Sequence, residues 1–166
     1  MEILLAFPIL TILTVFQTAI ASRVFLLHGS PDLVLLVILA WALQERVTTA
    51  WHWAIIGSLL VSIPSAQPVY ATIAGYLLAT GVTVLLKKRV WQVPFFAMSI
   101  ATSVGTFLAT SITWLVLILR GHPLPMMESL NLVILPSVLL NLLLSFVVFT
   151  LVSGLAEQFF PETMTT

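Results

Sequence analysis

The sequence predicts an all-α polytopic membrane protein with six transmembrane helices. Of its 166 residues, 60% are apolar and only 7% are Asp, Glu, Lys or Arg, whereas about a quarter of the residues in an ordinary soluble domain are charged. The mean hydropathy is +1.17, and long apolar segments recur along the whole chain. We therefore expect residues 1–166 to form one integral membrane domain whose outer surface faces the lipid bilayer.

Net charge and cysteine content exclude several classes of function. The formal net charge is zero, so no basic surface is available for nucleic acid. The chain has no cysteine, which excludes disulfides, thiolate metal sites and thiol nucleophiles.

The six spans follow from the length of helix that a bilayer requires, which is about 20 apolar residues. They are residues 3–21, 31–44, 47–63, 69–86, 91–119 and 130–154. The first is expected to be a retained span rather than a cleaved signal peptide, because Glu2 is its only early charge and a basic leader is missing. Its Pro8 is expected to bend it.

The second span is short, since its 14 residues rise only about 21 Å, although Ser30 and Pro31 suit a helix start. The third ends at an uncharged turn, 64–68, and the fourth ends at the basic cluster 87–89. The fifth is long enough to tilt and is ended by residues 120–125. The sixth precedes a short polar tail.

Six crossings place both termini on one side of the membrane. With cytoplasmic termini, Arg46 and 87–89 are inside, and Arg23 and Arg120 are outside, which fits the positive-inside rule. An alternative makes the second segment re-entrant, with five crossings and an outside N-terminus. Counting basic residues alone slightly favours that alternative.

Ionisable residues offer no evident chemistry within the spans. Every acidic and basic residue lies at or beyond a predicted span end, so no mid-membrane carboxylate is expected. The histidines, His28, His52 and His122, are scattered without metal-ligand spacing. We therefore expect a protein that is not an enzyme and has no cofactor or metal.

Small residues recur every four positions in the fourth and fifth spans. The two rows are Ala71, Gly75 and Ala79, and Ala97, Ala101, Gly105 and Ala109. Such rows let two helix backbones approach closely in a membrane. They indicate either packing between helices of this chain or a docking face for the transmembrane helix of a partner protein. A neighbouring threonine row, Thr102, Thr106 and Thr110, can hydrogen-bond across helices or to its own backbone.

Two further features concern buried polar groups and aromatic anchors. Asn141 lies well inside the sixth span, between Ser137 and Ser145. A buried amide needs partners, so we expect an interhelical hydrogen bond there, with a ligand contact as the alternative. Four tryptophans are expected at the headgroup level as interfacial anchors: Trp41, Trp51, Trp53 and Trp91.

The order of several short motifs resembles the MreD family of rod-shape-determining membrane proteins. The motifs are Pro31-Asp32-Leu33 before an apolar run, Gly57 in the third span, Ala74-Gly75-Tyr76-Leu77 in the fourth, and Leu135-Pro136-Ser137 with Leu140-Asn141-Leu142 in the sixth. The resemblance covers nearly the whole chain. One departure is that the family often has an aspartate after the third-helix glycine, where this chain reads 57–62 as Gly-Ser-Leu-Leu-Val-Ser.

The resemblance implies six helices with both ends in the cytoplasm and a fold similar to the substrate-binding subunits of energy-coupling-factor vitamin transporters. It implies a location in the bacterial cytoplasmic membrane. It also implies a non-catalytic scaffold role in cell elongation and peptidoglycan synthesis, beside MreB filaments. The implied partner is MreC, a single-span scaffold protein, with other elongation proteins or a second copy of this chain as further partners. The alternative is a subunit that binds a small, vitamin-like molecule for a membrane transporter.

Overall fold

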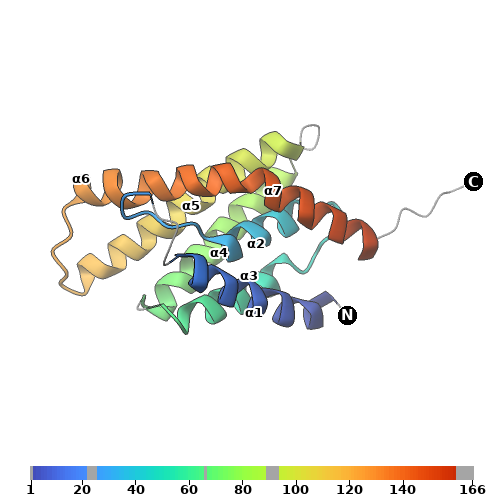
Figure 1. Ribbon diagram of the computed structural model, residues 1–166, viewed down its shortest axis with the longest axis horizontal. Coiled ribbons are helices and arrows are strands. Elements are labelled where there is room, and N and C mark those ends of the chain that lie inside the picture. Colours follow the sequence, from blue (N-terminus) through green and yellow to red (C-terminus); the bar gives the residue numbers. More distant parts are fainter. Residues whose placement is uncertain (1, 22–25, 66, 89–93, 160–166) are drawn as a thin grey trace, which may run out of the picture.

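The chain folds into a bundle of helices in a computed structural model that describes residues 2–21, 26–65, 67–88 and 94–159 (Figure 1). The elements are α1 (Glu2–Ala21), α2 (Leu33–Leu43), α3 (Ala50–Ser62), α4 (Val69–Lys87), α5 (Pro94–Leu119), α6 (Met126–Ser129), the π-helix η1 (Leu130–Ile134) and α7 (Leu135–Phe159). The described residues contain no strand beyond an isolated bridge between Leu26 and Gly29. The all-α prediction is confirmed. Three residues used in the sequence argument, Arg23, Arg89 and Trp91, lie outside the described residues.

Three helical stretches are long and apolar enough to cross a membrane. They are α4, α5 and the continuous stretch Met126–Phe159 that joins α6, η1 and α7. The other apolar helices, Leu5–Ala19 within α1, α2 and α3, are shorter. The predicted segments therefore appear as helices in the predicted order, and three of the six have the length of a full span.

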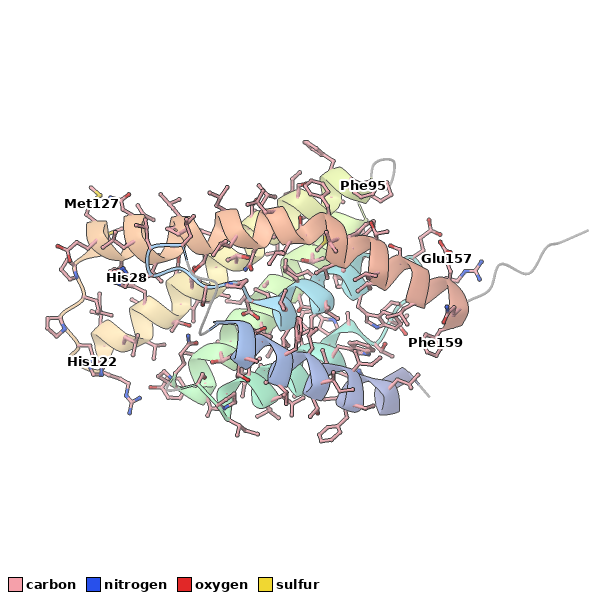
Figure 2. All side chains as sticks on the ribbon, viewed as in Figure 1. His28, Phe95, His122, Met127, Glu157 and Phe159 are labelled. Atoms are coloured by element: carbon pink, nitrogen blue, oxygen red, sulfur yellow. The ribbon has the colours of Figure 1, made fainter. Side chains whose placement is uncertain are left out.

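The bundle has two opposite ends, and the helix termini lie at one or the other. The start of α1 and the end of α7 lie at the same end (Figure 1), where Leu5, Trp53 and Phe159 line a common small apolar cavity. Figure 2 shows Glu157 and Phe159 at this end, and His28, His122 and Met127 at the opposite end.

The short helix α2 is the centre of the bundle. It packs against α1, α3, α4, α5 and α7, and all of its residues except Val37 and Leu43 are buried. Its sequence, LVLLVILAWAL, is apolar on every face, which suits a helix that is buried on all sides. Gly57 allows α3 to approach it, because a Cβ atom there would lie 2.6 Å from the Ile38 Cδ1 and 3.0 Å from the Val34 Cγ1.

The small-residue rows of α4 and α5 face each other inside the bundle. A Cβ atom on Gly75 would lie 3.0 Å from the Ala109 Cα, and one on Gly105 would lie 3.3 Å from the Ala79 Cβ and 2.9 Å from the Leu39 Cδ1. All seven members are buried: Ala71, Gly75, Ala79, Ala97, Ala101, Gly105 and Ala109. The rows therefore pack helices of this chain together, and they are covered rather than open to a partner.

Two of the predicted interfacial tryptophans lie in the core instead. Trp41 and Trp53 are 3% and 2% exposed, and their rings stack with centroids 4.6 Å apart and planes inclined by 22°. For this pair, the prediction of headgroup anchors was wrong, because the two rings bury each other between α2 and α3. Trp51 is exposed, as an anchor would be.

Candidate functional site

Asp32 is the centre of a polar cluster at the start of α2. Its Oδ1 accepts a hydrogen bond from the Leu35 backbone N–H at 3.0 Å, which caps the helix. The Tyr76 hydroxyl, from α4, donates to Oδ1 at 2.7 Å and to Oδ2 at 2.8 Å. The carboxylate therefore joins the N-terminus of α2 to the side of α4.

The chain that leads into α2 runs along α7, and its backbone N–H groups pair with that helix. His28 donates to the Leu132 carbonyl at 3.0 Å, Ser30 to the Ser137 Oγ at 3.3 Å and Asp32 to the Asn141 Oδ1 at 2.8 Å. The acceptor residues are four or five positions apart on the helical stretch, a rise of about 6 to 7.5 Å. Two residues of extended chain advance about 6.6 Å, so the two spacings match.

Pro136 explains why one of these acceptors is available. A proline within a helix has no N–H to donate to the carbonyl four residues earlier, which here belongs to Leu132. His28 supplies the missing donor. Gly29 is needed at this approach, because a Cβ atom there would lie 2.6 Å from the Ser137 backbone nitrogen and 2.8 Å from the Pro136 Cβ.

Every backbone N–H group from residue 28 to residue 32 donates a hydrogen bond. Gly29 donates to the Leu26 carbonyl at 2.9 Å, and Pro31 has no N–H to satisfy. Non-helical backbone is tolerated within a membrane only where its polar groups find partners inside the protein. The N–H groups of this segment meet that requirement through η1 and α7 and, at Gly29, through Leu26.

Asn141 connects this segment to α5. It is 0% exposed, and while its Oδ1 accepts from Asp32, its Nδ2 donates to the Thr106 Oγ1 at 3.0 Å. The expected interhelical hydrogen bond is present, and its partner comes from the predicted threonine row. In that row, Thr110 bonds to its own helix, and the Thr102 hydroxyl has no partner among the described residues.

Asp32 lies beside the middle of α4, one of the three helical stretches long and apolar enough to cross a membrane. Its partner Tyr76 is seven residues after the start of α4 and eleven before its end, or about 10 Å and about 16 Å along the axis. The carboxylate is therefore far from both ends of α4, although the sequence predicts no charge beside the middle of a span. Asp32 does stand at the beginning of its helix, but α2 has only 11 residues and begins deep inside the bundle.

Lys87 holds the other end of α2. Its ammonium group donates to the Gln44 carbonyl and, at 3.1 Å, to the Val47 carbonyl. The Gln44 amide also donates to the Ser153 Oγ of α7 at 3.1 Å. A cation at a helix C-terminus satisfies free carbonyls and interacts favourably with the helix dipole. The central helix is thus fixed by an acid at its start and a base at its end.

A large cavity extends from one end of the bundle to Asp32. Its volume is about 550 Å³, and its walls come from α1, the segment before α2, the α3–α4 turn, α4, α5 and the α6–α7 region. The polar residues that line it are Thr14, Gln17, Thr18, Ser30, Asp32, Ser65, Gln67, Thr72, Tyr76, Thr106, Thr110, Thr113, Ser129, Ser137 and Asn141. Apolar walls include Val61, Leu117, Leu124 and Trp114.

The five motif positions all act on α2. Pro31 and Asp32 end the segment that leads into α2, and Asp32 caps that helix. Tyr76 and Asn141 bind Asp32, and Gly57 allows α3 to pack against α2. Sequence reasoning missed Gln17, whose side-chain oxygen accepts from the Val34 N–H at 3.0 Å. Polarity at position 17, within an apolar span, is a signal that would have identified it.

Comparison with known proteins assigns no family to this arrangement, so the resemblance to MreD remains a prediction from the sequence motifs. No protein-family model, curated protein or solved structure matches the chain.

Proposed function

We propose that this protein is a non-catalytic scaffold subunit of the bacterial cell-elongation machinery, similar to MreD. In this role it crosses the cytoplasmic membrane six times, with both termini in the cytoplasm. It binds the membrane-anchored scaffold protein MreC and supports peptidoglycan synthesis along the cell cylinder.

The observation that carries the proposal is the convergence of the motif positions. Asp32, Tyr76 and Asn141 are far apart in the sequence, yet they are joined by hydrogen bonds of 2.7 to 2.8 Å. Pro31 and Gly57 support the same helix. Residues that share one structural task are expected to occur together in the members of a family. Here the task is to fix the interior of a rigid bundle.

A rigid bundle suits a scaffold because its outer faces keep a fixed shape for a partner. The outward side chains of α5 and α7 are large and apolar, as with Phe107, Leu115 and Leu143. A partner's transmembrane helix can pack on such faces by van der Waals contact. Because the small-residue rows are covered, we place the MreC contact on an outer face.

Co-purification from detergent tests the scaffold proposal. MreC from the same organism should co-purify with this protein and raise its melting temperature. The matched control is MreC with its transmembrane helix replaced by an unrelated apolar helix, which should bind less. Absence of co-purification with native MreC, together with an unchanged melting temperature, would contradict the proposal.

A small-molecule-binding subunit of a membrane transporter is a second candidate, favoured by the cavity. A volume of about 550 Å³ is within the range of about 300 to 1,000 Å³ that is usual for ligand pockets. Native mass spectrometry of the purified chain tests this role: a stoichiometric small molecule would favour it, and a chain without one would favour the scaffold alone.

A further inference from the structure

We propose that the cavity is a binding site for a protonated amine, which Asp32 and the surrounding threonine oxygens hold through hydrogen bonds. The inference deepens the second candidate function by naming its ligand class, and it applies equally if the chain is a scaffold that binds a ligand. It does not depend on MreC.

The charge of the residues that line the cavity favours a cation as the ligand. Asp32 is the one charged side chain among the described residues that line the cavity, and part of it remains exposed there. A carboxylate deep in a membrane protein is costly unless it is compensated. Its donors, the Tyr76 hydroxyl, the Leu35 N–H and the Gln17 side chain, are all neutral. A cation in the cavity would complete the compensation, whereas an anion would be repelled.

The hydroxyl groups of the cavity walls favour a ligand that donates hydrogen bonds. Thr14, Thr110 and Thr113 each donate their hydroxyl proton to a carbonyl of their own helix, at 2.7, 2.7 and 3.1 Å. A hydroxyl that already donates can offer only acceptor lone pairs to the cavity. The Tyr76 hydroxyl is likewise committed to Asp32. The walls are therefore rich in acceptors, and an ammonium group, which carries three donors, matches them.

Thr72 supplies an independent indication of a ligand. It lies one turn before Tyr76 on α4 and lines the cavity, and it is 4% exposed. Its hydroxyl oxygen is buried without a hydrogen-bond partner among the described residues. A buried hydroxyl without a partner costs about 1 to 3 kcal/mol, so a polar ligand group that reaches this oxygen would be stabilised by it. Trp114 adds an aromatic wall of the kind that attracts cations.

Binding to a matched series of probes tests the proposal. The probes are 2-phenylethylamine, 2-phenylethanol and phenylacetate, which share one ring and differ in the terminal group. Binding is measured by equilibrium dialysis on the intact chain in uncharged maltoside micelles, with empty micelles subtracted. The amine should bind at least about tenfold more tightly than the other two, because only its hydrogen bond to Asp32 joins two charged groups. Equal binding of the three probes, or preference for the carboxylate, would overturn the proposal.

Substitution of Asp32 locates the site. Asp32→Asn removes the charge and keeps a good helix cap, so the chain should fold while its affinity for the amine falls about tenfold or more. The matched control is Glu157→Gln, an exposed carboxylate at the opposite end of the bundle, which should leave binding unchanged. Retention of wild-type affinity in a folded Asp32→Asn variant would overturn the proposal.

A second variant keeps the test valid if Asp32→Asn does not fold. Thr113→Trp narrows the cavity without touching Asp32 and should abolish amine binding, while Thr150→Trp, on an exposed position of α7, should not. Unchanged amine binding in folded Thr113→Trp would overturn the proposal.

Nanodiscs of two different lipids show whether the amine comes from a lipid headgroup or is a free small molecule. In nanodiscs of phosphatidylethanolamine, competition with 2-phenylethylamine would assign the ammonium group to a lipid headgroup. If binding is equally tight there and in phosphatidylcholine nanodiscs, which lack ammonium N–H donors, the ligand is a free small amine. Either result supports an ammonium site, whereas absence of amine binding in both lipids would overturn it.

Discussion

The Tyr76 hydroxyl donates to both carboxylate oxygens of Asp32, at 2.7 and 2.8 Å. This contact joins the middle of α4, which is long enough to span a membrane, to the start of the 11-residue helix α2. Because Asp32 also caps α2 through the Leu35 N–H, one carboxylate fixes both the position and the first turn of the central helix.

Removing the Tyr76 hydroxyl should therefore destabilise the whole bundle. Tyr76→Phe removes the hydroxyl that donates to the Asp32 carboxylate, at a site where Tyr76 is 2% exposed. A hydrogen bond to a charged group contributes about 1.5 to 3 kcal/mol, so we expect a loss of stability of that size. Thermal unfolding in detergent, followed by tryptophan fluorescence, measures it.

Tyr70→Phe is the matched control, because Tyr70 is on the same helix and is 57% exposed. It should melt as the wild type does. Equal melting temperatures for the two variants would show that the Tyr76 hydroxyl contributes nothing to stability.

The class of the fold and the order of its helices could be predicted from the sequence. Apolar length and the positions of Pro, Gly and charge are local properties, and they place each helix correctly along the chain. The small-residue rows and Asn141 were also interpretable, because close packing and amide pairing depend on residue type and helical spacing.

The depth of Asp32 could not be predicted, because the sequence does not show where a short apolar helix begins in the bilayer. Residues 31–44 have the composition of a span, yet α2 is an 11-residue interior helix preceded by chain that pairs with α7. The partners of that chain, such as Leu132 and Ser137, lie more than 100 residues away. Trp41 and Trp53 show the same difficulty, since stacking between helices and anchoring in headgroups use the same residue type.

The shape of the cavity could likewise not be predicted from the sequence. The sequence shows that Asn141 and the α5 threonines are polar, but the walls also come from α1, the α3–α4 turn and the α6–α7 region. A space between that many elements depends on how the helices tilt and where α2 stops, and neither quantity is encoded in one segment.

Asn141 should be as important as Tyr76, because its amide satisfies two partners. Asn141→Leu preserves the approximate volume but leaves the Asp32 N–H and the Thr106 hydroxyl without their partner. We expect a loss of about 1 to 3 kcal/mol, measured by thermal unfolding. Asn131→Leu, at an exposed position on η1, is the control and should be neutral. A wild-type melting temperature for Asn141→Leu would refute the role of the amide.

Coupling between Asn141 and Thr106 can be separated from these losses by a double-mutant cycle. Combining Asn141→Leu with Thr106→Val should cost less than the sum of the two single changes, by about 0.6 to 1.7 kcal/mol as for other hydrogen bonds between membrane helices. Strict additivity would mean that the 3.0 Å contact does not stabilise the fold.

Lys87 should stabilise the far end of α2. Lys87→Met removes the ammonium group that binds the Gln44 and Val47 carbonyls, and we expect a loss of about 0.5 to 2 kcal/mol. Lys88→Met changes an adjacent, exposed lysine and controls for general loss of charge at the headgroup level. Equal effects of the two substitutions on the melting temperature would remove the specific role of Lys87.

Three of the helical glycines, Gly75, Gly105 and Gly154, should respond differently to a single added methyl group. At Gly75, a Cβ atom would lie 3.0 Å from the Ala109 Cα, so Gly75→Ala requires α4 and α5 to separate. At Gly105, the nearest atom is a Leu39 methyl group at 2.9 Å, which can rotate away, and at Gly154 nothing lies within 4 Å.

Alanine is favoured over glycine in a helix by about 1 kcal/mol, and an overpacked core loses about 1 to 3 kcal/mol. Gly154→Ala should therefore raise the melting temperature, Gly105→Ala should change it little and Gly75→Ala should lower it. A different order of the three melting temperatures would contradict the close α4–α5 packing.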